Sequence, residues 1–270
     1  MTSASSRRSL TRRDDADPAP KGERIAKVLA RAGLCSRREA ERWIAEGRVA
    51  VDGVTLTSPA MSVSDPARVT VDGQPLPDIQ PTRLWRYHKP AGLLTTHDDP
   101  RGRPTVFDRL PPALGRVISV GRLDFNSEGL LLLTNDGAVA RRLELPATGW
   151  RRRYRVRVHG APDAATLASL AKGLELEGVR YGPIEAALDR QQGANAWLTV
   201  SLTEGKNREI RKVMDHFGWP VNRLIRIAYG PFQLGNLAVG SLAEVPRKVL
   251  TEQLGKDIAP KPHAHRRRPA

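Results

Sequence analysis

The chain has 270 residues, of which 40% are hydrophobic, and its 44 Lys and Arg against 29 Asp and Glu give a formal net charge of +15. This length allows two domains of ordinary size, and the hydrophobic content allows a sizeable core. A chain this basic usually binds a polyanion such as a nucleic acid, although a GC-rich genome that favours Arg codons would also raise the charge. The single cysteine, Cys35, excludes an internal disulfide framework and a Cys-rich zinc site.

The two ends of the chain are polar and charged. Residues 1–21 predict a disordered basic tail, and residues 251–270 predict a basic C-terminal tail, because neither can bury a core. No apolar run approaches the 18 residues of a membrane span, and the N-terminus has no apolar signal core. The six His lack a second ligand at metal-binding spacing. We therefore expect a cytoplasmic protein that uses neither a membrane nor a metal.

Residues 22–80 predict a compact first domain. ERIAKVLARAG has apolar residues at helical spacing and a stop at Gly33. Ser36 then predicts the N-cap of a second helix, RREAERWIAEG, with Glu39 completing a capping box. RVAVDGVTL and VTVDGQPL each predict a hairpin with an Asp-Gly turn.

This order of two short helices and a small sheet, with SRREAERWIAEGRVAVDG at its centre, resembles the S4 RNA-binding domain. In that family, basic residues on the two-helix face contact structured RNA. The resemblance implies RNA contacts for the arginines around the second helix, and a solvated helix face is the alternative; these are Arg37, Arg38, Arg42 and Arg48.

Prolines mark a linker near residues 77–83, and a second domain is predicted over residues 84–250. Strand-like runs (ISVGRL, GLLLLT, YRVRVHG, AWLTVSLTE, RLIRIAYG) alternate irregularly with helical segments (DGAVARRLEL, PDAATLASLAKG, NREIRKVMDHFG). No regular βαβ repeat and no Gly-rich phosphate loop are visible. This pattern predicts an α+β fold, with a mixed, mainly antiparallel sheet in the second domain.

The segment VGRLDFNSEGLLLLTNDG, residues 120–137, carries the chemistry. Its four consecutive leucines predict a strand that is covered on both faces and ends in the turn Asn135-Asp136-Gly137. Asp124 lies just before that strand, between buried segments. Residue type alone leaves Asp124 more plausible as a turn or cap residue than as a catalytic one.

GRLDFNSEGLLLLTNDG is similar to the active-site motif of the pseudouridine synthases of the RsuA and RluB group, with Ser127 where the group more often has Thr. The opening WRYHKPAGLLTT is also typical of the group, and the similarity covers residues 22–250. The resemblance implies that Asp124 is catalytic and that Tyr154, in RRRYRVRV, stacks on the target base. LTEGKNREIRKVM matches the group's third motif and supplies Arg211 and its apolar neighbour Ile210.

These residue types suit the isomerisation of uridine. The glycosidic bond to uracil moves from N1 to C5, and this change needs an oxygen nucleophile or a general base at the sugar. Asp124 supplies that oxygen. A nearby cation keeps this carboxylate ionised, and Arg211 is the group's candidate. The base must leave its stack and needs an aromatic face, provided by Tyr154. Arg122 is expected to fill the vacated gap or to bind a phosphate. No cofactor is expected.

NREIRK together with RLIRIAYG most resembles the large-subunit branch of the group, typified by RluB, so 23S rRNA is the expected substrate. We expect the protein to be a monomer. Two alternatives stay open. One is the same reaction on 16S rRNA. The other is a non-catalytic S4-type RNA-binding or ribosome-assembly factor. The residue types do not decide whether Asp124 attacks C1′ or removes a sugar proton.

Overall fold

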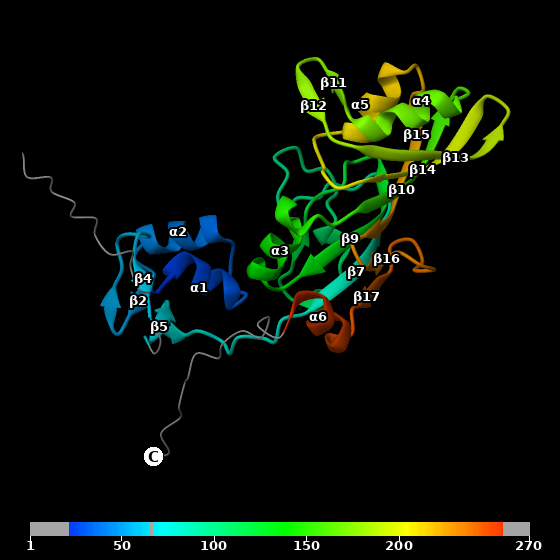
Figure 1. Ribbon diagram of the computed structural model, residues 1–270. Helices are drawn as coiled ribbons and strands as arrows, with labels where there is room; N and C mark the ends of the chain where they lie inside the picture. The colour runs from blue at the N-terminus through cyan, green and yellow to red at the C-terminus, as the bar shows by residue number, and fades with distance from the viewer. Residues whose placement is uncertain (1–21, 65–66, 256–270) are drawn as a thin grey trace, which may run out of the picture. The chain divides into compact units, whose positions relative to one another are not determined.

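The computed structural model describes residues 22–64 and 67–255. They form two compact units, the first within residues 22–76 and the second from Pro77 onward (Figure 1). The predicted tail at residues 1–21 and residues 256–270 of the predicted C-terminal tail lie outside the described residues. None of the described helices is long and apolar enough to cross a membrane.

The first unit consists of two helices, a two-stranded sheet β1-β4 and a four-stranded antiparallel sheet with the order β3-β2-β5-β6. Its elements are β1 (Glu23–Arg24), α1 (Ile25–Arg31), α2 (Arg37–Ala45), β2 (Val49–Val51), β3 (Val54–Thr55), β4 (Ser62–Val63), β5 (Val69–Val71) and β6 (Gln74–Pro75). The apolar faces of both helices and the inward residues of the strands share one core.

The local signals in the first unit predict its structure well. The Ser36 side chain accepts a hydrogen bond from the Glu39 N–H at 3.1 Å and caps α2 as expected. Glu39 itself pairs with Arg42 at 2.8 Å. Both predicted hairpins are confirmed, since each Asp-Gly turn has positive φ at its two central residues, the geometry that matches the twist of a tight hairpin. Helix α1 begins two residues later than its pattern suggests, because Glu23–Arg24 pair with β4.

The second unit is built on a nine-stranded mixed sheet with the main order β13-β14-β10-β15-β9-β7-β17. All its neighbouring strands are antiparallel except β15 and β9. The predicted α+β class and mainly antiparallel sheet are confirmed. The strands of this sheet are β7 (Leu84–Lys89), β8 (Ile118–Val120), β9 (Ser127–Thr134), β10 (Arg152–His159), β13 (Ile184–Gln192), β14 (Asn195–Leu202), β15 (Val221–Tyr229), β16 (Phe232–Gln233) and β17 (Leu242–Glu244).

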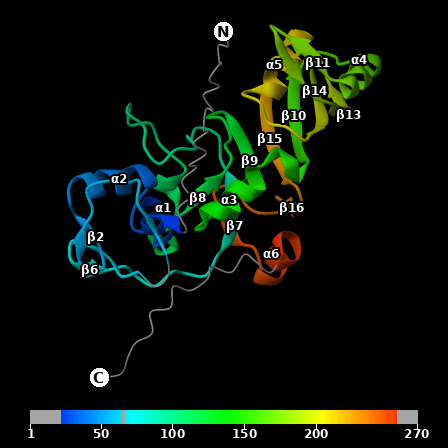
Figure 2. The same ribbon diagram turned by 60° about the vertical axis from the view of Figure 1, so that its left-hand side comes forward.

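Helices cover this sheet on both faces. They are α3 (Gly137–Glu144), α4 (Ala164–Ser169), α5 (Glu209–His216) and α6 (Arg247–Leu254), and a separate hairpin is formed by β11 (Leu174–Leu176) and β12 (Val179–Tyr181). Helices α4 and α5 share one core with β10, β14 and β15. Helices α3 and α6 share the other with β7 and β9, beside which they lie in both views (Figures 1 and 2).

The four leucines of β9 connect the two cores. Leu131 and Leu133 belong to the core under α4 and α5, while Leu130 and Leu132 belong to the core under α3 and α6. All four are fully buried. The prediction of a strand covered on both faces is therefore confirmed, and β9 becomes a rigid support for the loop that precedes it.

Two predictions are corrected. Residues 251–254, assigned to the C-terminal tail, form the end of α6, because Leu250 and Leu254 pack into the second core. Asp136, interpreted as a turn residue, caps α3, since its carboxylate accepts the Ala138 N–H at 2.8 Å.

Gly129 lies where β9 and β15 run side by side, with φ +99°. A Cβ there would lie 2.3 Å from the Arg226 carbonyl oxygen. Gly129→Ala should therefore lower the free energy of unfolding by about 3 kcal/mol or more, since it combines a left-handed backbone with overpacking. Gly178→Ala is the matched control: it has a similar φ of +74° but open space around it. It should cost about 1 kcal/mol. Urea unfolding followed by circular dichroism compares the two, and equal losses would show that the close approach of the strands is unimportant.

Candidate active site

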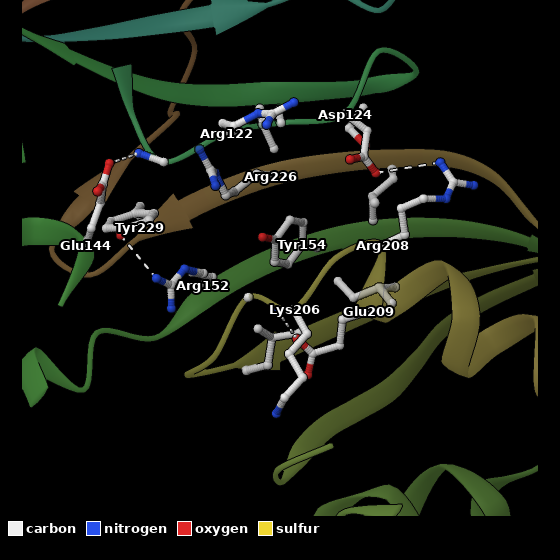
Figure 3. Close-up of a pocket in the computed structure, with 17 residues that line it drawn as sticks. Arg122, Asp124, Glu144, Arg152, Tyr154, Lys206, Arg208, Glu209, Arg226 and Tyr229 are labelled. Carbon is white, nitrogen blue, oxygen red and sulfur yellow. Dashed lines mark hydrogen bonds and ion pairs between the residues drawn. The ribbon is translucent and has the colours of Figure 1, made fainter. Parts of the chain in front are cut away.

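A cavity of about 270 Å³ opens between the loop before β9, the start of β10 and the segment before α5 (Figure 3). Five basic and three acidic side chains line it, so its field favours a polyanion. The lining residues are Gly121, Arg122, Leu123, Asp124, Ser127, Glu144, Arg152, Tyr154, Leu202, Gly205, Lys206, Arg208, Glu209, Ile210, Leu224, Arg226 and Tyr229.

Asp124 lies at one end of this cavity, and its side chain is 34% exposed. Its carboxylate is 3.8 Å from the Arg208 guanidinium. Arg208 has φ +53°, an uncommon backbone conformation for a residue with a side chain, and lies directly before α5. Strained positions of this kind are concentrated at functional sites.

The loop that carries Asp124 is held in place by Lys89, which is completely buried. The Lys89 ammonium donates to the carbonyl oxygens of Ser127 at 2.8 Å, Pro90 at 3.0 Å, Asp124 at 3.1 Å and Phe125 at 3.4 Å. Burial lowers the pKa of Lys89 to about 8, and the nearby Asp124 and Glu128 carboxylates oppose this shift. A buried ammonium thus fixes the backbone carbonyls from Asp124 to Ser127, directly after the carboxylate.

The residues after Lys89 complete this cradle. Gly92 donates its N–H to the Phe125 carbonyl at 2.8 Å, and the Thr95 hydroxyl donates to the Leu123 carbonyl at 2.9 Å. The segment KPAGLLTT therefore supports the Asp124 loop over its whole length. The sequence alone predicts no structural role for this segment.

Tyr154 and Ile210 both form walls of the cavity. Tyr154 is on β10, is 8% exposed, and lies between Asp124 and Arg226 in the close-up (Figure 3). Ile210 belongs to the first turn of α5 and is buried in the same core as Tyr154. The structure thus brings an aromatic ring and an apolar side chain into the cavity that contains Asp124.

Arg211 and Arg122 have different surroundings. Arg211 donates to the carbonyl oxygens of Asn126 and Val221, both at 3.1 Å, and so contacts the backbone of the Asp124 loop. Burial lowers the pKa of Arg211, and Arg208 acts in the same direction, while Asp124 raises it. The ion pair with Asp124 is made by Arg208, which is not predicted from the sequence. Arg122 lines the cavity and is exposed.

Two buried charged residues of the cavity, Arg226 and Glu209, are not predicted from the sequence. Arg226 is 3% exposed; its Nε donates to the Leu130 carbonyl at 2.8 Å, but one terminal nitrogen is buried with no partner among the described residues. Glu209 accepts the Lys206 N–H at 2.9 Å, and burial raises the pKa of its carboxyl well above the usual range.

The alternation of buried and exposed positions along a strand indicates the two buried cations, Arg226 and Lys89. Arg226 is in phase with the buried Leu224 and Ala228, and Lys89 is in phase with the buried Trp85 and Tyr87. A cation in the apolar phase of a strand indicates a buried charge with a specific task.

The four arginines of the first unit that the sequence assigns to RNA contacts fall into two pairs. Arg42 contacts Glu39 and Glu46, and Arg48 contacts Asp72 at 2.6 Å while its guanidinium lies over the Trp43 ring. Arg37 and Arg38 are exposed and have no ion pair within the described part of the chain. Residues 22–64 and 67–255 contain no group of three or more His, Cys, Asp or Glu that could hold a metal ion.

Comparisons with known proteins agree with this geometry. Residues 83–216 match the family described as RNA pseudouridylate synthase, and residues 23–66 match the S4 domain. An uncharacterised RNA pseudouridine synthase of Rickettsia felis is 50% identical over 228 residues, which cover 84% of this chain and 99% of that protein. The ribosomal large subunit pseudouridine synthase B of Haemophilus influenzae is 46% identical over 80% of this chain and 62% of that protein.

A crystal structure of a pseudouridylate synthase has the same fold, with a TM-score of 0.62 and 22% identity over 86% of this chain and all of that one. The extent of the sequence match and the two matched families lead to one conclusion. The chain belongs to the RNA pseudouridine synthases, isomerases that convert uridine to pseudouridine in RNA, and it carries an S4 domain before its catalytic domain.

Proposed function

We propose that this enzyme isomerises a specific uridine of 23S rRNA in the cytoplasm, with Asp124 as its catalytic carboxylate. One observation carries the catalytic assignment: Asp124 is a partly exposed carboxylate in a cavity that also contains an aromatic ring, on a loop fixed by a buried ammonium. The name of the Haemophilus influenzae relative, a ribosomal large subunit synthase, favours 23S over 16S rRNA as the substrate.

No atom is gained or lost overall in the reaction, because substrate and product are isomers. The N1–C1′ bond breaks, the base rotates, C5 bonds to C1′, and the C5 proton is released while N1 gains one. An Asp124 oxygen starts this sequence at the sugar, either by attack on C1′ or by removal of a sugar proton. The Arg208 guanidinium stabilises the ionised carboxylate through its charge. Glu209 is a buried acid of the same cavity, and none of these steps uses it.

The remaining residues position the nucleotide. Tyr154 offers a ring face for the extruded base, and Ile210 closes the cavity beside it. Arg211 acts through the loop, because its guanidinium binds the Asn126 carbonyl. Arg122 is exposed at the same cavity and either fills the gap that the base leaves or binds a phosphate. In the S4 domain, Arg37 and Arg38 are the stronger candidates for phosphate contacts, since acidic partners already neutralise Arg42 and Arg48.

Pseudouridine mapping across the rRNA of cells tests this assignment. A strain that lacks the gene should lose pseudouridine at a position in 23S rRNA, and the wild-type gene should restore it while Asp124→Asn does not. Asp136→Asn is the matched control in the same motif; it should restore the modification, because Asn caps a helix about as well as Asp. Purified Asp124→Asn should keep its affinity for RNA.

Each other outcome of the mapping contradicts one part of the proposal. Restoration by Asp124→Asn would remove the catalytic assignment. Loss of pseudouridine at a position in 16S rRNA would show that 16S rRNA, and not 23S rRNA, is the substrate. An unchanged pseudouridine pattern would favour a non-catalytic assembly factor.

Tyr154→Phe and Tyr154→Ala separate the ring from the hydroxyl. Phe keeps the stacking face and should retain most of the affinity for an RNA that contains the target uridine. Ala should lose about 1–3 kcal/mol of binding, the usual contribution of one stacked base. Titration of both variants with the same RNA, beside a thermal melt that confirms folding, makes the comparison. Equal losses from the two substitutions would show that the ring face does not hold the base.

A further inference from the structure

Strand β10 has two chemically different faces. Tyr154, Val156 and Val158 are buried in the core under α4 and α5. The alternate residues, Arg153 and the next two arginines along the strand, are exposed on the opposite face. Residues two apart on one face of a strand are about 7 Å from each other. The strand therefore presents a straight row of three guanidinium groups, Arg153, Arg155 and Arg157.

This second face of β10 and its neighbour β14 is open within the described residues. The core under α3 and α6 contains no residue of β10 or β14, and the helices α4 and α5 lie on the other side of these strands (Figure 1). On β14, Trp197 pairs in register with Arg157 and is only half-buried. The Arg155 guanidinium lies over the Trp197 ring, 4.8 Å from its centroid.

Neighbouring acids do not compensate the charge of this row. Glu128 is bound to Arg223 at 2.8 Å, and Glu185 is paired with Arg151. The Asp189 carboxylate accepts the Thr199 hydroxyl at 3.0 Å and keeps its charge, which leaves one acid against the three arginines. Arg153, Arg155 and Arg157 have no ion pair with any residue in 22–64 or 67–255. Like charges on one strand repel each other, so the row destabilises the sheet slightly unless an anion lies on it.

We propose that this surface, the arginine face formed by Arg153, Arg155, Arg157 and Trp197, is a second RNA-binding site of the catalytic domain. It is separate from the cavity, because Tyr154 points to the opposite side of the same strand. Guanidinium groups bind phosphates through paired N–H donors, and a half-exposed indole offers a stacking face for an unpaired base. The partner is therefore the phosphate backbone of substrate RNA outside the target uridine.

The arginine face should affect the binding of long RNA rather than the rate of isomerisation. The triple variant Arg153→Gln, Arg155→Gln, Arg157→Gln removes three charges and keeps polar side chains on the strand. The matched control removes three exposed arginines elsewhere in the domain, at Arg142, Arg180 and Arg247. Both are titrated, over a salt series, with a short stem-loop that contains the modified uridine and with a long fragment of the same rRNA. Circular dichroism confirms that both variants are folded.

For the long fragment, the triple variant should reduce the log–log salt slope by about 2 to 3, since each phosphate contact contributes roughly 0.7–0.9. The control should leave that slope nearly unchanged. Affinity for the stem-loop and the single-turnover rate at saturating enzyme should also stay within about threefold of wild type. Ultraviolet cross-linking of the long fragment should label the β10 and β14 peptides.

Three results would overturn the proposal. An unchanged slope with no cross-link would show a solvated face. Equal loss in the control would show that only overall charge matters. Equal loss for the stem-loop would show that the face contacts the target region itself. The proposal depends on the RNA substrate but not on its identity, because the mapped rRNA, 23S or 16S, supplies both test RNAs.

Discussion

The structure of the candidate site depends on one buried ammonium group. Lys89 lies at the end of β7, and its hydrogen bonds within the described residues all go to backbone carbonyl oxygens, three of them in the segment from Asp124 to Ser127. Its folded-state pKa of about 8 lies below the ordinary value of 10.5, so the unfolded chain binds more protons between these values. The residue thus opposes folding when charged, and this opposition is relieved as the pH rises from about 8 to 10.5. A costly buried charge of this kind is consistent with a positioning role.

The sheet around Lys89 makes that position rigid. β9 begins where the Asp124 loop ends, and its leucines are packed from both faces by separate cores. Gly129 allows β9 to approach β15, which brings Arg226 into the cavity. Tyr154 comes from β10, and Ile210 and Arg208 come from α5 and its start. Residues of β10 and β15, the start of α5 and the loops before β9 and α5 therefore supply most of the cavity lining.

Sequence patterns predict those parts of the molecule that depend on local signals. The S4 helices, their Ser36 cap and the Asp-Gly hairpins follow from capping and turn chemistry, and the family motifs indicate Asp124 and Tyr154. Strand β13 is not predicted, because IEAALDRQQ is an exposed edge whose conformation comes from pairing with β14. The roles of Lys89 and Arg226 depend on burial between strands distant in sequence, and the Arg208–Asp124 pair depends on a loop conformation. None of these follows from residue type.

The single-turnover isomerisation rate of Lys89→Met at saturating enzyme tests the central claim most directly. Met keeps the length and apolar stem of the side chain but donates no hydrogen bond, so the loop carbonyls lose their common partner. Misplacement of a reacting group by about 1 Å can reduce a rate about 100-fold. A positioning role for Lys89 predicts a loss of that size in the folded variant, with affinity for RNA within about threefold of wild type. A rate within about threefold of wild type would contradict it, because Asp124 would then be positioned without the ammonium.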